Sequence, residues 1–210
     1  MYNLAATTGH AAMPNNTQSQ ATNFRTYYDL ETYLFDTVSK RFAENHTLSA
    51  FDFFCIVIWK ANLAKSRIAR RLLAKGTYAD LDSAVHALVG AIATAPSPKE
   101  RLRVLIQGWG FLLPMASAIL TVLYPDDFTI YDIRVYGVLG DFEWVQNKTR
   151  YDELWDGYSK YITAVGKATP AELSLRDKDR WLWGKSFYEQ LSREIENKFP
   201  TRRSEDETGT

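Results

Sequence analysis

The aspartate at position 132 stands where an acid is least expected, between two apolar runs of the chain. It follows the segment Phe128-Thr129-Ile130-Tyr131 and opens an expected short helix over residues 133–139. A carboxylate at that position caps the helix, which contributes about 1 kcal/mol. In a site that excludes water, it also stabilises a developing positive charge or deprotonates an attacking water. Residue type and position alone leave both uses open.

Basic side chains gather between residues 51 and 75, where Asp52 is the only acid. The run holds Lys60, Lys65, Arg67, Arg70, Arg71 and Lys75. We expect one long helix here, on which Lys60, Arg67 and Arg71 fall near one face. Such a face is either simply solvated or contacts the phosphates of a nucleic acid. Lys60 is also an amine that chemistry could use, or a salt-bridged lysine.

Aromatic residues make up 14% of the chain, with six tryptophans, and these rings must either pack or bind something. Four of the tryptophans are candidates for stacking on a nucleobase: Trp59, Trp109, Trp181 and Trp183. Trp181 and Trp183 are two residues apart and cannot share a helix face, so we expect at least one of them in the core. Asn62 is a candidate for hydrogen bonding to a base edge.

Composition excludes several kinds of site. The single cysteine, Cys55, rules out a disulfide framework and cysteine-rich metal centres within the chain. The three histidines form no His-x-x-x-His pair, so we expect no metal site. Lys and Arg number 25, as do Asp and Glu, and the resulting zero net charge does not favour a nucleic-acid partner, although a local basic face is compatible with one. No apolar run reaches the roughly 18–20 residues that span a bilayer. We expect a cytoplasmic protein without a membrane segment.

The elements that must position these residues are predicted to be helices only. Apolar spacing of three and four residues, and the absence of alternating strands with hairpin turns, favour an all-α fold without repeats. A disordered leader is expected over residues 1–23 and a polar tail over 201–210, which leaves one helical domain at 24–200. The expected helices are 27–43, 51–75, 78–94, 98–106, 114–123, 133–139, 151–166 and 176–197. Ser49, Ser97 and Ser174 are the predicted N-caps.

Residues 108–140 resemble the helix-hairpin-helix DNA glycosylase superfamily, which includes the 8-oxoguanine glycosylases. The resemblance lies in a hairpin at Gly110-Phe111-Leu112, a small-residue helix with Ala116 and Ile119-Leu120, and a single acid, Asp132, before an apolar helix that ends at Leu139-Gly140. Arg176 to Trp183 is similar to a C-terminal motif of bacterial members with this fold. The resemblance implies a glycosylase-like helical domain that acts on DNA, with Asp132 as the catalytic aspartate and Gly108, Gly110 and Leu112 at the DNA backbone.

Two departures from the superfamily pattern bear on activity. A hairpin glycine is replaced by Leu112, or else Gly108 and Gly110 supply the glycine pair with an insertion after them. Glycine suits this position because the hairpin backbone approaches a phosphate directly or through a monovalent cation. Bifunctional members place a Schiff-base lysine where this chain has Pro114, so the resemblance implies a monofunctional enzyme without a cofactor. The alternative is an inactive relative that acts as a DNA-binding or protein-interaction module.

Overall fold

The structure is a computed structural model that describes residues 23–168 and 170–199. Within those ranges every regular element is helical, which confirms the predicted all-α class. The leader predicted at 1–23 falls outside the described residues except for Asn23, and the tail at 201–210 falls outside entirely. None of the helices in the described ranges combines the length and the apolar composition needed to cross a membrane.

The first helical segment covers residues 30–45, slightly later than the predicted 27–43. A 3-10 turn at Phe24–Tyr27 precedes α1 (Leu30–Tyr33), and a π-helical stretch at Leu34–Val38 leads directly into α2 (Ser39–Asn45). The predicted apolar positions Leu34, Val38 and Phe42 are buried. This segment therefore packs one apolar face against the rest of the molecule, as its spacing predicts.

The prediction of one continuous helix over 51–75 was wrong. The chain forms α3 (Ala50–Ala61), a 3-10 turn at Asn62–Ala64 and α4 (Lys65–Ala74). Ala61 leaves helical geometry with φ −161° and ψ 83°. Asn62 is a poor helix former, because its side chain makes local hydrogen bonds that compete with the helix. Here its side-chain oxygen accepts a hydrogen bond from Lys65 Nζ at 2.8 Å. Because of this break, Lys60 and Arg71 belong to different helices and do not share a face.

A pair of helices joined by a short loop follows. After α5 (Leu81–Thr94), the helix α6 (Pro98–Arg103) continues as a π-helical stretch to Gly108, and the loop 109–112 leads into α7 (Leu113–Leu123). Ten of the eleven residues of α7 are buried. A helix that is apolar on every side belongs in the centre of a core, and α7 accordingly packs against both α3 and α6.

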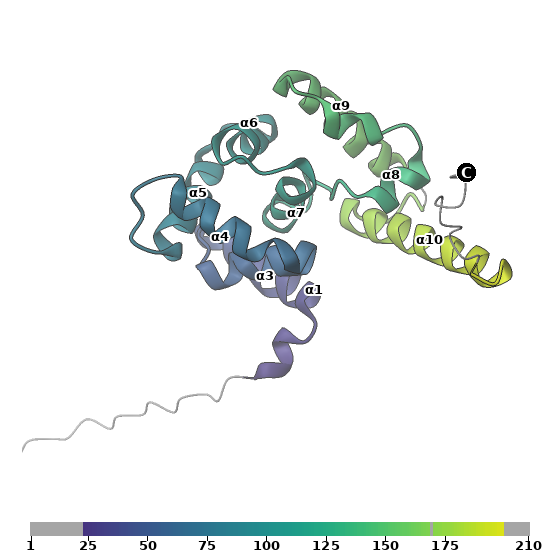
Figure 1. Cartoon of the computed structure of the whole chain (residues 1–210), viewed down its shortest axis with the longest axis horizontal. Helices are drawn as coiled ribbons and strands as arrows, with labels where there is room; N and C mark the ends of the chain where they lie inside the picture. Colours follow the sequence, from purple (N-terminus) through teal and green to yellow (C-terminus); the bar gives the residue numbers. More distant parts are fainter. Residues whose placement is uncertain (1–22, 169, 200–210) are drawn as a thin grey trace, which may run out of the picture.

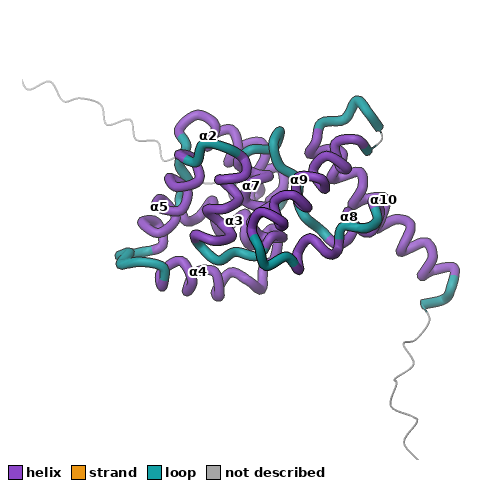
Figure 2. Tube along the Cα trace, turned by 90° about the horizontal axis from the view of Figure 1, so that it is seen from above, coloured by secondary structure: helices purple, strands orange, loops and turns teal. Residues whose placement is uncertain are grey.

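The last three helices form a second group beside this core (Figure 1). They are α8 (Ile133–Leu139), α9 (Tyr151–Lys167) and α10 (Leu175–Glu196), with a 3-10 turn at Glu143–Asn147 before α9. Helix α8 has the predicted bounds. Figure 2 shows the C-terminal end of α10 extending beyond the other helices. The three predicted serine caps are confirmed, since Ser49, Ser97 and Ser174 each accept a backbone N–H of the following turn.

Candidate functional site

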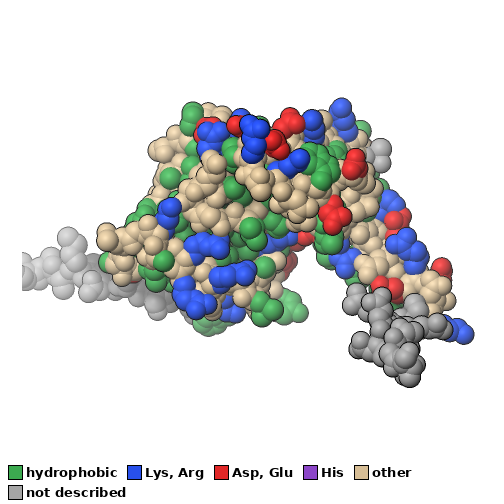
Figure 3. All heavy atoms as spheres, turned by 45° about the horizontal axis from the view of Figure 1, so that its top comes forward, with side chains coloured by type: hydrophobic (Ala, Val, Ile, Leu, Met, Phe, Trp, Pro, Cys, Tyr) green, Lys and Arg blue, Asp and Glu red, His purple; other side chains and the backbone are tan. Residues whose placement is uncertain are grey.

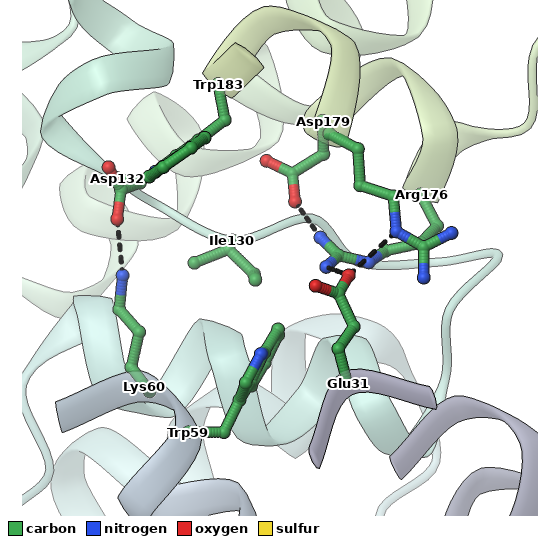
Figure 4. A pocket seen from close by; sticks show the side chains of 9 residues that line it. Glu31, Trp59, Lys60, Ile130, Asp132, Arg176, Asp179 and Trp183 are labelled. Atoms are coloured by element: carbon green, nitrogen blue, oxygen red, sulfur yellow. Dashed lines mark hydrogen bonds and ion pairs between the residues drawn. The ribbon is translucent and has the colours of Figure 1, made fainter. Parts of the chain in front are cut away.

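A pocket of about 450 Å³ lies where the two groups of helices meet. Its walls come from α1, α3, the segment before α8, and α10, and the lining residues are Glu31, Trp59, Lys60, Ile130, Asp132, Arg176, Asp179, Arg180 and Trp183. Figure 3 shows the surface hollowed between the body of the molecule and α10, and Figure 4 shows the pocket from close by. Its volume lies within the range of about 300–1,000 Å³ that is typical of small-molecule sites.

Asp132 serves both as a helix cap and as part of the pocket wall. Its Oδ1 accepts the backbone N–H of Arg134 at 3.0 Å, which caps α8. Its Oδ2 lies 2.6 Å from Lys60 Nζ at the end of α3. The side chain of Asp132 is 20% exposed and that of Lys60 is 16% exposed. The capping role is therefore confirmed, the same carboxylate also lines the pocket, and Lys60 is a salt-bridged lysine.

Hydroxyl groups hold the extended segment that carries Asp132 into the pocket. Tyr158 and Tyr161 of α9 donate hydrogen bonds to the carbonyl oxygens of Thr129 and Ile130 at 2.6 and 2.8 Å. The backbone N–H of Tyr131 donates to Ser117 Oγ of α7 at 2.9 Å. These bonds satisfy buried backbone groups that have no helical partner. These bonds hold the segment in place and so fix the position of the Asp132 carboxylate.

A network of charged side chains forms the opposite wall. Arg176 of α10 binds Asp179 one turn later and Glu31 of α1, and Arg180 Nε also binds Glu31, at 2.7 Å. Arg176 Nε is buried without a hydrogen-bond partner in the described part of the chain. Figure 4 shows one Asp179 oxygen directed at Arg176 and the other directed away from it, toward the side of the pocket that holds Asp132.

Asp179 is the most strongly perturbed acid of the pocket. Burial raises its pKa to about 6, the negative charge of Asp132 adds to the rise, and the positive charges of Arg176 and Lys60 oppose it. The side chain is only 4% exposed. Two carboxylates in different environments are the arrangement by which glycosidases separate an acid from a base or stabiliser.

Two aromatic side chains contribute flat surfaces to the pocket. Trp59 lies edge-on to Phe35, with ring centroids 5.8 Å apart, and the Arg176 guanidinium lies 5.3 Å from the Trp59 ring. Trp183 is stacked on Phe187, and the Arg134 guanidinium lies over both rings. Trp59 and Trp183 were candidates for base stacking, and the fold brings them to the site of Asp132.

The other predicted base-binding residues lie outside the pocket lining. Trp109 is only 8% exposed and stacks on Tyr78 with centroids 5.9 Å apart, so it is a core residue. Trp181 and Trp183 on α10 are 39% and 44% exposed, so the expectation that at least one of them lies in the core was wrong. The Asn62 amide oxygen accepts from Lys65 in the turn after α3. The pocket is therefore not lined by Trp109, Trp181 or Asn62.

The predicted hairpin and the basic helix meet each other. The Arg71 guanidinium donates to the carbonyl oxygen of Gly110, which has a left-handed φ of 70°. Leu112 is extended, with φ −81° and ψ 152°, and its side chain is 71% exposed. Arg71 thus supplies positive charge at the hairpin carbonyl. Gly110 is the glycine that the backbone geometry of the loop requires.

Helix α4 presents basic side chains that have no acidic partner within 4.0 Å among the described residues. They are Lys65, Arg67 and Arg70, together with Lys75 at the C-cap of the helix, and all are exposed. Figure 3 shows lysine and arginine side chains gathered on the part of the surface that α4 occupies. Lys60 is not part of this face, because it is turned into the pocket. Of the three residues predicted to share a face, Arg67 and Arg71 remain on α4.

Sequence reasoning did not predict five of the pocket-lining residues, namely Glu31, Ile130, Arg176, Asp179 and Arg180. One signal was present: Arg176, Asp179 and Trp183 recur at spacings of three and four, which places them along one face of α10. A helix face that carries an arginine, an aspartate and a tryptophan fits neither a fully solvated surface nor a purely apolar core. Glu31 carries no comparable signal in its own segment.

No group of three His, Cys, Asp or Glu side chains in residues 23–168 and 170–199 is arranged to hold a metal ion. Comparison with known proteins gives no match: no protein-family model, no curated protein and no solved structure is similar to this chain. Function therefore has to be inferred from the pocket itself.

Proposed function

We propose that this protein removes a damaged or modified base from DNA by hydrolysing its N-glycosidic bond. Cleavage of that bond creates an oxocarbenium-like positive charge on the sugar. Asp132 is the catalytic carboxylate that stabilises this charge and accepts a proton from the attacking water. The enzyme is monofunctional, without a lyase step, and requires no cofactor.

One observation carries this proposal: Asp132 lines a pocket between Trp59 and Trp183. An aspartate that only capped α8 would satisfy the helix equally well in open solvent. Here the Oδ1 atom of Asp132 accepts the capping bond, which fixes the carboxylate. The Oδ2 atom pairs with Lys60 in the pocket wall. Preorganised charge in a site with limited water is the main source of electrostatic catalysis.

The size and walls of the pocket suit one extruded nucleotide. Base extrusion from a duplex costs a few kcal/mol. Stacking on an aromatic side chain returns about 1–3 kcal/mol for each base. Trp59 and Trp183 are the rings available for this stacking, and the cavity of about 450 Å³ is of the volume that accepts a single ligand of that size.

The DNA backbone is proposed to lie along the hairpin and α4. Arg71 ties the loop at Gly110 to α4, so the exposed backbone of the hairpin and the side chains of Arg67 and Arg70 belong to one connected surface. Unpaired arginines give sequence-independent affinity through phosphate contacts. A zero net charge is compatible with this role because the contacts depend on a local face.

The monofunctional assignment is tested by trapping. Lys60 is the lysine among the pocket-lining residues, and its amine pairs with Asp132. The protein is treated with abasic-site DNA and borohydride, which reduces a Schiff base to a stable adduct. We expect no adduct. An adduct that forms with wild type and with Lys65→Met, but not with Lys60→Met, would refute the monofunctional assignment.

The second candidate is an inactive relative that binds DNA or protein. Leu112 favours it, since an exposed leucine at the hairpin hinders close approach to a phosphate. The Lys60–Asp132 ion pair also favours it, because the lysine compensates the charge that catalysis would use. In this case the pocket would bind a ligand without turnover.

A panel of duplexes, each containing a different modified base, separates the two candidates. Released bases are identified by mass spectrometry, and binding to each duplex is measured in parallel. Release by wild type that is lost in Asp132→Asn supports the enzyme. Binding without release across the panel supports the module. The Asn side chain still accepts the Arg134 N–H, so the cap and the fold are retained.

A further inference from the structure

The pocket holds a second carboxyl group that the proposed hydrolysis has not used. Asp179 lies in the first turns of α10, and both it and Asp132 line the cavity. One Asp179 oxygen binds Arg176, and the other is directed toward the side of the pocket that holds Asp132 (Figure 4). Two carboxyl groups from different elements therefore line one cavity, where both can reach the same ligand.

We propose that Asp179 is the proton donor to the departing base, and that this lets the protein release neutral bases as well as positively charged ones. This inference rests on the proposed glycosylase function. As the C1′–N bond breaks, its electron pair moves to the base, and the Asp179 carboxyl gives its proton to a ring nitrogen. Water then bonds to C1′ and loses a proton to Asp132. The products are a neutral base and an abasic sugar, and the proton returns from Asp132 to Asp179 through solvent.

The surroundings of Asp179 are consistent with a group that holds a proton near neutral pH. Charged or titratable groups approach it from each neighbouring element: Arg176 on its own helix, Asp132 before α8, Lys60 on α3, and Tyr158 and Tyr161 on α9. Burial outweighs the two cations and raises the pKa of Asp179 to about 6. Both tyrosine hydroxyls donate to backbone carbonyls and stay protonated. A general acid works best with a pKa near the working pH.

The choice of leaving group gives a test within a single variant. A neutral base departs as an anion unless it receives a proton. N7-methylguanine already carries a positive charge on its ring, departs as a neutral molecule and needs no donor. Asp179→Asn should therefore slow release of hypoxanthine, 8-oxoguanine and uracil by about 100-fold or more. Release of N7-methylguanine should change by less than about threefold, which also shows that the variant is folded and keeps its pocket.

The experiment measures single-turnover base release from these four duplexes for wild type, Asp179→Asn and Glu189→Gln. Glu189 is an exposed acid on the same helix, so its amide variant is the matched control. For neutral bases, the wild-type rate should fall tenfold for each pH unit above about 6, and the Asn variant should lose this dependence.

Equal slowing of neutral bases and N7-methylguanine, or no slowing of either, overturns the role of Asp179 while leaving the glycosylase function intact. If wild type releases N7-methylguanine and none of the neutral bases, the role of Asp179 is likewise overturned and the glycosylase function is retained. Absence of release from every duplex by wild type overturns both the function and the role of Asp179. An unchanged thermal unfolding midpoint in Asp179→Asn excludes unfolding as the source of a uniform loss.

Discussion

Lys60 Nζ lies 2.6 Å from Asp132 Oδ2 and joins the end of α3 to the start of α8, across 72 positions of the chain. Both side chains are largely shielded from water. The pair therefore ties the core helices to the C-terminal group at the pocket. The pair also places a cation, the Lys60 ammonium, beside the Asp132 carboxylate before any ligand binds.

Lys60→Met should destabilise the protein by about 1.5–3 kcal/mol, because it removes a charged hydrogen bond and leaves Asp132 without its partner. The measurement is the free energy of unfolding from urea denaturation. Lys160→Met is the matched control, since Lys160 pairs with Asp156 at 2.8 Å on an exposed helix face. The control should change stability by less than about 1 kcal/mol. Equal effects in both variants would show that the Lys60–Asp132 pair adds nothing to the fold.

The stability that Asp179 contributes should depend on pH. Its native pKa of about 6 lies above the ordinary value of 3.8, so the folded protein keeps this proton where the unfolded chain releases it. That contribution is complete below pH 3.8 and is lost as the pH rises through about 6. Between pH 3.8 and about 6, the free energy of unfolding falls by about 1.4 kcal/mol for each pH unit.

Asp179→Asn carries no titrating proton and serves as the reference for this effect. Unfolding free energies of wild type and variant are compared at intervals between pH 4 and 7. Wild type should lose stability relative to the variant as the pH rises over this interval. A difference that is constant with pH, or that grows in favour of wild type, would contradict the raised pKa.

Gly110→Ala should cost about 1–2 kcal/mol, because a left-handed φ of 70° is unfavourable for a residue with a Cβ. Gly108→Ala is the control, at the end of the π-helical stretch two residues before Gly110. A Cβ at Gly108 meets no atom within 4 Å, and its φ lies outside the left-handed region, so we expect a neutral or slightly stabilising effect. Thermal unfolding of the two variants checks this difference, and equal midpoints would show that the hairpin tolerates a side chain at Gly110.

Local signals in the sequence predicted most of the fold. The bounds of α8 follow from Asp132 as a cap and Gly140 as a stop, and Ser49, Ser97 and Ser174 mark helix starts by the same short-range chemistry. The break at Asn62–Ala64 was not predicted, because the neighbouring Lys, Arg and Ala residues all favour a continuous helix.

Pocket-lining residues were predicted only where a residue carries its own signal. Asp132 is an acid among apolar residues, and Trp59 and Lys60 belong to a basic and aromatic segment. Glu31 and Arg176 meet across 145 positions of the chain, and no local pattern specifies that contact. Tertiary packing also placed Trp109 in the core, although its residue type equally suits a base.

The proposed DNA-binding face makes a prediction about salt. Each phosphate contact steepens the dependence of log K on log salt concentration by about 0.9. Replacing both Arg67 and Arg70 by Gln should reduce the slope by about 2 and weaken binding to every sequence alike. The double control Lys40→Gln, Lys160→Gln removes two exposed charges that already have acidic partners. An equal reduction in both double variants would show a general charge effect instead of phosphate contacts on α4.

The central claim is that Asp132 acts on an extruded nucleotide in the pocket. The most direct measurement is the single-turnover rate of base release by wild type, Asp132→Asn and Asp126→Asn on the best duplex of the panel. Asp126 is an exposed acid in the preceding turn and serves as the control. We expect Asp132→Asn to lower the rate by at least about 100-fold, with Asp126→Asn close to wild type. A rate that is unchanged in Asp132→Asn would contradict the account.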